Sequence, residues 1–506
     1  MPTDNYIEKI LKARVYDVAQ ETPLDHAPRL SRRINNRVML KREDLQPVFS
    51  FKLRGAYNKI AQLSESAARR GVICASAGNH AQGVALAAQR RGVPAVIVMP
   101  LTTPSIKVTA VRDLGGEVVL HGDGYDAAYD HAQSIVRERN LVFVHPFDDP
   151  DVIAGQGTIG MEILRQSRGE LDAIFVPVGG GGLISGIAVY AKYLNPKIKI
   201  IGVEPVDAAA MHDSMQQKKR VTLERVGIFA DGVAVKRVGE ETFRLCREHV
   251  DEIVLVDTDE ICAGIQDIFE DTRSIVEGAG ALAVAGLKKY CALHQWHDKR
   301  IVAVNSGANM NFDQLRYVAE RSDVGQAREA LLAVEIPEQR GSFLKFCEVL
   351  GSRAITEFNY RFGAKERAQI FVGFGIANKQ EREEVVAQLR AAGYGVTDMT
   401  DNEIAKLHVR YMVGGHVNGS VGHERLYRFE FPERKGALLN FLKAVGTRWN
   451  ITLFHYRNHG SDYGRVLAGI DVSSADTAEF LDHLNVLHYS YSDETNNPVY
   501  RIFLGN

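Results

Sequence analysis

Short apolar runs alternate with longer amphipathic stretches from about residue 72 to residue 309. The short runs are rich in β-branched residues and the longer ones have a helical period, as in βαβ units around a parallel sheet. The pattern predicts strands at 71–75, 95–99, 117–120, 141–144, 174–178, 198–203 and 301–305. An α/β fold with an open parallel sheet therefore occupies the first part of the chain.

The pattern changes beyond about residue 322, where an internal repeat indicates two copies of one module. Glu-Ile-Pro-Glu-Gln-Arg-Gly at 335–341 returns as Glu-Phe-Pro-Glu-Arg-Lys-Gly at 430–436, and Phe-Asn-Tyr-Arg at 358–361 returns as Phe-His-Tyr-Arg at 454–457. Each copy predicts a strand, a helix and two strands, as in a ferredoxin-like module. A duplicated module that serves only assembly is an alternative.

These boundaries predict four segments. They are an N-terminal domain at 1–321, a linker at 322–328, a first module at 329–402 and a second module at 424–503.

Composition and charge narrow the class of protein. The 506-residue chain is 45% hydrophobic and 25% charged, which is typical of a soluble globular protein with a large core. Its net charge of −2 favours neither nucleic acid nor an anionic membrane as a partner. Five scattered cysteines argue against disulfides and a zinc site and favour a reducing cytoplasm. We assign no metal-binding residue, and the sequence does not reveal whether a metal ion is required. We find no export signal and no apolar run that predicts a membrane span.

Lys52 is a candidate reactive amine. It lies between Phe51 and Leu53 in the sequence Ser-Phe-Lys-Leu-Arg-Gly-Ala. Burial beside apolar residues would lower its pKa and free the amine to condense with a carbonyl. The same local sequence also fits a surface lysine whose amine reaches solvent.

A run of glycines separates a predicted strand from a predicted helix. It consists of Gly179, Gly180, Gly181 and Gly182, followed by Leu183. Each glycine costs about 0.5–1 kcal/mol relative to alanine in regular structure, so the run indicates that the backbone must approach a ligand closely. At a helix N-terminus the expected ligand is a phosphate, although a flexible turn is an alternative. A dinucleotide site is disfavoured because the spacing is not GxGxxG and Glu204 is its sole acidic support.

Two more loops follow predicted strands. The first contains Ser76, Ala77, Gly78, Asn79 and His80. Its helix N-terminus could hold a carboxylate and the amide of Asn79 could reach a ring hydroxyl, although Asn79 could equally cap the helix. We expect His80 to support the site rather than act as a base.

The second loop, at 305–309, contains Ser306. Its hydroxyl could bond a heteroaromatic nitrogen, or the segment could be an ordinary turn.

Together the four motifs resemble those of serine/threonine dehydratases, a family of fold type II (tryptophan synthase β-type) pyridoxal phosphate enzymes. The resemblance covers about residues 5–315 and rests on Ser-x-Lys-x-Arg-Gly-Ala, Ser-Ala-Gly-Asn-His-Ala-Gln-Gly, Gly-Gly-Gly-Gly-Leu and Ser-Gly-Ala-Asn. The repeated C-terminal region resembles the paired ACT-like regulatory modules of biosynthetic threonine dehydratases. This resemblance implies two parallel-sheet subdomains followed by two α+β modules.

The resemblance also implies a role for each candidate residue. Lys52 would form the internal aldimine with pyridoxal 5'-phosphate, and Phe51 would lie beside the cofactor ring. Asn79 would contact the ring hydroxyl, Ser306 the pyridine nitrogen and residues 179–183 the phosphate, while residues 76–80 would bind substrate. A neutral serine cannot pair with a charged ring nitrogen as a carboxylate can, so we expect β-elimination rather than transamination.

The activity implied is conversion of L-threonine to 2-oxobutanoate and ammonia, with Lys52 as the general base. Isoleucine would inhibit through the C-terminal modules, valine would oppose it, and the family suggests a cytoplasmic homotetramer. Cysteine synthase and threonine synthase match the loop at 76–83 less well. L-serine dehydratase, serine racemase and a catalytically inactive amino-acid sensor remain alternatives.

Overall fold

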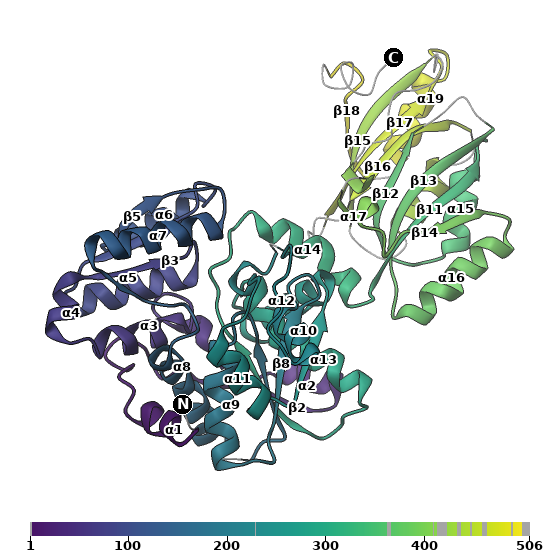
Figure 1. Cartoon of the computed structure of the whole chain (residues 1–506). Helices are drawn as coiled ribbons and strands as arrows, with labels where there is room; N and C mark the ends of the chain where they lie inside the picture. The colour runs from purple at the N-terminus through teal and green to yellow at the C-terminus, as the bar shows by residue number, and fades with distance from the viewer. Residues whose placement is uncertain are drawn as a thin grey trace. The chain divides into compact units, whose positions relative to one another are not determined.

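The computed structural model describes residues 3–168, 170–227, 229–361, 366–407, 409–411, 423–432, 437–445, 448–457, 463–486 and 489–497. The chain divides into two compact units, Met1–Gly325 and Gln326–Asn506 (Figure 1). The helix α14 (Gln314–Gly325) ends the first unit, so the predicted linker at 322–328 begins inside a helix.

The first unit contains two sheets, both largely parallel. The smaller has the order β5 (Glu117–Leu120), β4 (Ala95–Met99), β3 (Val72–Ala75) and β6 (Val142–Phe143). The larger has the order β1 (Leu24–His26), β2 (Arg37–Arg42), β10 (Arg300–Asn305), β7 (Ala173–Pro177), β8 (Lys199–Pro205) and β9 (Glu252–Val256), with only β1 antiparallel to its neighbour. Every strand predicted from the sequence is present, which confirms the α/β fold, whereas β1, β2 and β9 were not predicted.

Helices connect the strands of both sheets. In the first unit they are α1 (Thr3–Leu11), α2 (Pro28–Ile34), α3 (Lys52–Ala61), α4 (Glu65–Arg70), α5 (Asn79–Arg91), α6 (Ser105–Asp113), α7 (Tyr125–Arg139), α8 (Pro150–Gln166), α9 (Gly182–Leu194), α10 (Ala210–Gln217), α11 (Glu240–His249), α12 (Thr258–Thr272) and α13 (Gly278–Leu293), with short 3-10 turns η1 (Glu43–Leu45) and η2 (Asp231–Val233). Neighbouring residues of β7 belong to different hydrophobic cores. Phe175 packs in a core with residues of α12 and α13, and Ile174 packs in another core with residues of α9. The larger sheet is therefore buried on both faces, as parallel sheets require.

The second unit contains one antiparallel sheet shared by both copies of the repeat. The first copy comprises β11 (Glu329–Pro337), α15 (Ser342–Leu350), β12 (Ile355–Arg361), β13 (Arg367–Gly375), α16 (Lys379–Ala391) and β14 (Gly395–Asp398). The second comprises β15 (Glu424–Pro432), α18 (Ala437–Val445), β16 (Asn450–Arg457), β17 (Tyr463–Asp471), α19 (Thr477–Val486) and β18 (Ser490–Asp493). The segment between the copies contains α17 (Glu403–Leu407) and η3 (Val409–Tyr411).

Antiparallel pairing of β12 with β16 joins the two modules into one sheet. Aromatic residues of both copies, among them Phe346, Phe358, Phe441 and Phe454, share one core. The paired α+β modules are confirmed, and each has a second helix and a fourth strand that were not predicted. In the second copy the motif residues 433–436 and Gly446, and the predicted module end at 498–503, lie outside the described residues.

Candidate active site

One pocket in the first unit gathers all the residues predicted to bind the cofactor. Its lining includes Phe51, Lys52, Asn79, Ser306 and the run from Gly179 to Leu183. The loops that carry Asn79, the glycines and Ser306 follow β3, β7 and β10, so they lie at the carboxyl ends of parallel strands, where open α/β sheets bind ligands. Of the predicted substrate loop, Ser76, Ala77, Gly78 and His80 do not belong to this lining.

Lys52 is the first residue of α3, and its side chain enters the pocket. Its Nζ lies 3.2 Å from the carbonyl oxygen of Pro146, to which it donates, and 5.3 Å from the centre of the Phe51 ring. Burial lowers the pKa of Lys52 to about 8, although the carboxylate of Glu277 opposes this shift. A substantial fraction of the amine is therefore neutral just above pH 7, as condensation with an aldehyde requires.

The glycine run forms a fixed loop at the start of α9. Gly181 has a φ of +97°, and a Cβ at Gly180 would lie 2.2 Å from the ring of Phe147. The carbonyl oxygen of Gly180 accepts a hydrogen bond of 2.6 Å from Thr242 Oγ1. Because side chains are excluded and the carbonyl is anchored, the loop fits a phosphate cradle better than a flexible turn.

The side chain of Asn79 does not cap its helix, which was the alternative that the sequence left open. The helix α5 begins at Asn79 itself, with Gly78 in the N-cap position. Asn79 Nδ2 donates to Glu277 Oε1 over 2.6 Å, and Asn79 Oδ1 accepts from Asn309 Nδ2 over 2.7 Å. One amide N–H remains available for a ligand in the pocket.

Ser306 and His80 complete the set of candidate side chains. The buried Ser306 Oγ donates to the carbonyl oxygen of Ala279 over 3.2 Å and keeps its lone pairs for a further partner. His80 Nε2 lies 2.9 Å from the carbonyl oxygen of Val144, and burial lowers the pKa of His80 to about 3. A ring that stays neutral and contacts the backbone supports the loop rather than accepting protons near neutral pH.

Sequence reasoning missed several lining residues. Phe147, Gly232 and Glu277 reach the pocket from segments that carry no predicted motif. The sequence contained one weak indication of Glu277, which is an acidic residue directly before the run of small residues Gly-Ala-Gly-Ala. Nothing in that local sequence predicts that the residue is buried. Glu204, considered above as a dinucleotide ligand, instead accepts the backbone N–H groups of Met211 and His212 at the start of α10.

A buried charge network anchors the helix that carries Lys52. Arg54, fully buried on α3, makes hydrogen bonds of 2.6–3.0 Å to both carboxylates of Glu43 and Glu162. Lys41 also lies 2.5 Å from Glu162, so two cations offset two carboxylates. The network connects β2, η1, α3 and α8.

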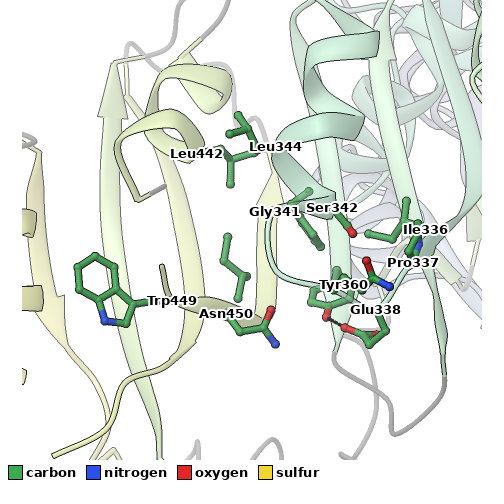
Figure 2. Close-up of a pocket in the computed structure, with 13 residues that line it drawn as sticks. Ile336, Pro337, Glu338, Gly341, Ser342, Leu344, Tyr360, Leu442, Trp449 and Asn450 are labelled. Carbon is green, nitrogen blue, oxygen red and sulfur yellow. Dashed lines mark hydrogen bonds between the residues drawn. The ribbon is translucent and has the colours of Figure 1, made fainter. Parts of the chain in front are cut away.

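A second pocket lies in the C-terminal unit where the two modules join (Figure 2). The turn before α15, Tyr360 of β12, Leu442 of α18 and the start of β16 line it. Figure 2 shows the hydroxyl of Tyr360 bonded to the carboxylate of Glu338. Burial first, and then this bond, raise the pKa of Tyr360. The lining thus combines aliphatic side chains with one acidic group.

Two kinds of feature are absent from the described parts of the chain. No helix there is both long and apolar enough to cross a membrane, and no group of three or more His, Cys, Asp or Glu side chains is arranged to hold a metal ion. All five cysteines are buried and stay outside any disulfide.

Residues 15–307 match the family of pyridoxal-phosphate dependent enzymes, and residues 320–409 and 416–504 match the C-terminal regulatory domain of threonine dehydratase. The chain is 57% identical to the biosynthetic L-threonine dehydratase of Burkholderia multivorans over the full length of both chains. It is 54% identical to the Escherichia coli protein of that name, covering 99% of this chain and 97% of the relative.

Among solved structures, the processed threonine deaminase isoform 2 of Solanum lycopersicum is 52% identical, with a TM-score of 0.62 over 63% of this chain and 93% of the other. Maize serine racemase is 33% identical, with a TM-score of 0.58 over 62% and 96%. Each of these structures covers less than two thirds of this chain, whereas the full-length relatives above cover at least 99% of it. The chain therefore belongs to the biosynthetic threonine dehydratases, a family of pyridoxal phosphate enzymes with a C-terminal regulatory domain.

Proposed function

We propose that this protein is a threonine ammonia-lyase, which converts L-threonine to 2-oxobutanoate and ammonia as the committed step of isoleucine biosynthesis. The observation that carries the proposal is the pocket in which an amine of lowered pKa faces a glycine cradle, an amide and a neutral hydroxyl. Full-length similarity to biosynthetic threonine dehydratases selects threonine among the substrates of such enzymes.

The residues present fit pyridoxal phosphate. Lys52 would hold the aldehyde carbon, and the loop from Gly179 to Leu183 would take the phosphate because no side chain fills the cradle. Asn79 would donate its remaining N–H to the ring oxygen. When bound, the cofactor supplies an electron sink for the carbon bonds of an amino acid.

The chain's own groups would then direct the reaction. Lys52 Nζ, once released by the incoming substrate, removes the α-proton, for which its lowered pKa suits it at neutral pH. The backbone N–H groups of residues 76–80, at the N-terminus of α5, would orient the substrate carboxylate. Ser306 offers the ring nitrogen no charge, which favours loss of the β-hydroxyl over transamination.

A comparison of two lysines on one helix tests this proposal. The variant Lys52→Ala should form no 2-oxobutanoate from L-threonine, because it lacks both the cofactor anchor and the base. Lys59→Ala is the matched control, since Lys59 also belongs to α3 but pairs with Asp149 and Asp151 outside the pocket. Near-normal turnover by Lys52→Ala would refute the assignment.

L-Serine tests the substrate preference. The threonine methyl group is worth about 1–3 kcal/mol in an apolar pocket, so L-serine should react roughly 10–200-fold less efficiently. Equal or better kcat/KM for L-serine would favour an L-serine dehydratase, and formation of D-serine would favour a racemase. A protein that binds amino acids but consumes none would favour the sensor.

We further propose that the pocket between the modules binds isoleucine as a feedback inhibitor. Leu344, Leu442 and Ile451 would surround the branched side chain, and the carboxylate of Glu338 would pair with the amino group. The carboxylate of isoleucine suits the N-terminus of α15, whose N-cap Gly341 has a φ of +82°. Valine, one methylene smaller, would bind the same pocket about fourfold more weakly.

Two tyrosine variants test the regulatory pocket. In Tyr360→Phe the hydroxyl that holds Glu338 is lost, so the isoleucine concentration for half-maximal inhibition should rise about tenfold. Tyr394→Phe is the control, because Tyr394 packs on Phe346 in the same module without lining the pocket. An unchanged isoleucine response in Tyr360→Phe would place the effector elsewhere.

The remaining parts of the proposal concern assembly, opposition by valine and location. We propose a homotetramer in the cytoplasm in which valine relieves inhibition by isoleucine. Five buried thiols that form no disulfide support a reducing compartment. Sedimentation analysis tests the tetramer, and assays with both amino acids together test the opposition.

A further inference from the structure

Glu277 is a buried acid in the active-site pocket to which the proposed reaction assigns no task. Its side chain is 4% exposed. It occupies the N-cap position of α13 but makes no side-chain hydrogen bond to that helix. Instead its Oε1 accepts the 2.6 Å hydrogen bond from Asn79 Nδ2. The carboxyl therefore serves a pocket residue rather than its own helix.

This bond fixes the orientation of the Asn79 amide. Only the NH2 end of an amide can donate to a carboxylate, and the oxygen end accepts from Asn309 Nδ2. Asn309 is held in turn by a 2.9 Å bond to the carbonyl oxygen of Val48. The group that Asn79 presents to a ring oxygen is thus an N–H, set by its two neighbours.

Two glycines leave room for the carboxyl of Glu277. A Cβ at Gly307 would lie 2.7 Å from Glu277 Oε1, which is closer than any real contact. A Cβ at Gly232 would lie 3.3 Å from the same atom and 3.6 Å from Asn79 Nδ2. The backbone therefore closes around the paired carboxyl and amide from two segments far apart in the sequence.

The charged groups that face the carboxyl are Lys52, Asp231 and Lys107. Burial raises the pKa of Glu277 to about 7, with a further rise from Asp231, while Asn79 and Lys107 oppose it. Lys107 also pairs with Asp231 over 2.5 Å. The negative charge of Glu277 in turn raises the pKa of Lys52. The charges of the acid and the amine are therefore coupled.

We propose that Glu277 is a positioning residue that orients the Asn79 amide toward the cofactor ring oxygen and, as a carboxylate, strengthens proton binding at the cofactor-bearing nitrogen of Lys52. This inference rests on the proposed attachment of the cofactor to Lys52. Glu277→Gln separates the two effects, because it keeps an acceptor oxygen for Asn79 and removes the charge. Glu277→Asp keeps the negative charge, but its side chain is one methylene shorter and moves the carboxylate away from Asn79.

The test is a pH titration of the visible absorbance of the full-length holoenzyme, with cofactor affinity measured alongside. In Glu277→Gln the pH at the midpoint of the absorbance change should fall by about one unit. This is the lower end of the range by which a neighbouring opposite charge shifts a pKa. In Glu277→Asp the midpoint should stay near that of the wild type while the cofactor dissociation constant rises about tenfold. Glu204→Gln is the matched control and should change neither, because Glu204 is also buried, with its pKa raised to about 8 by burial, but lies outside the pocket.

Four results would overturn the inference. An unchanged midpoint in Glu277→Gln, or an equal fall in Glu204→Gln, would show that the charge of Glu277 does not act on the cofactor. If Glu277→Gln does not fold, unchanged cofactor affinity in Glu277→Asp would contradict the positioning role. A wild-type enzyme without visible absorbance would instead overturn the attachment to Lys52, and this inference with it.

Discussion

Replacing Arg54 with methionine should destabilise the catalytic unit by an amount that the structure allows us to estimate. Arg54 is completely buried and bonds both Glu43 and Glu162. Methionine has a similar length but leaves two buried carboxylates with Lys41 as the one cation of the network. Removing one partner of a buried ion pair costs about 3–5 kcal/mol, because the charge left behind stays desolvated.

This loss of stability corresponds to a measurable fall in Tm. For a unit of 325 residues, an unfolding entropy of about 2.1 cal/mol/K per residue converts 3–5 kcal/mol into a Tm lower by roughly 4–7 °C. The assay is thermal loss of the visible absorbance at saturating cofactor, which reports the catalytic unit alone.

Arg91→Met provides the control, because the pair of Arg91 with Glu65 leaves those side chains 31% and 71% exposed. Such a pair is worth at most about 1 kcal/mol, or less than about 2 °C. A Tm for Arg54→Met within 2 °C of the wild type would refute the reasoning that the network anchors α3.

Three more predictions concern the cofactor and regulation. Gly180→Ala places a methyl group 2.2 Å from the ring of Phe147, and overpacking of about 1–3 kcal/mol should weaken cofactor binding roughly 5–150-fold; an unchanged dissociation constant would contradict the cradle. Reconstitution of the cofactor-free enzyme should accelerate as the pH rises through about 8, where Lys52 loses its proton, and a rate that is flat from pH 7 to 9 would contradict the lowered pKa. Deletion of residues 326–506, a separate compact unit, should leave threonine turnover but abolish inhibition by isoleucine; cooperative inhibition of the truncated enzyme would place the effector site in the catalytic unit.

The sequence predicted best those strands that are apolar throughout. β4, Ala-Val-Ile-Val-Met, is buried at every position and reads directly as the centre of a parallel sheet. β2, Arg-Val-Met-Leu-Lys-Arg, was missed because its Lys41 and Arg42 appear polar. Lys41 is buried because it pairs with Glu162, 121 residues away in the sequence, and such a partner is invisible along the chain. Arg42 is buried because it pairs with Asp44 and Asp25, which the apolar pattern does not reveal either.

The same limit applies to the active site. The motifs identified the residues of the pocket that were predicted to bind the cofactor, because each motif has an unusual composition and three of the four follow a predicted strand. They did not identify Phe147, Gly232 or Glu277. Whether Asn79 caps a helix or faces a ligand depended on Glu277, which lies 198 residues away in the sequence. The binding roles of Asn79, Ser306 and the substrate loop stay predictions that the variants above examine.

The second helix and fourth strand of each module were missed for a different reason. In α16 the sequence is dominated by charged and polar residues, and only Val385, Val386 and Leu389 are buried. β14 has four residues and is mostly exposed. Elements that contribute so little apolar surface give a weak periodic signal.

The most direct test of the account is the covalent attachment of the cofactor. Reduction of the holoenzyme with borohydride, followed by proteolysis and mass spectrometry, should find the pyridoxyl group on the peptide that contains Lys52. The visible absorbance should disappear in the same step. A label on any other lysine, or no label at all, would contradict the central claim.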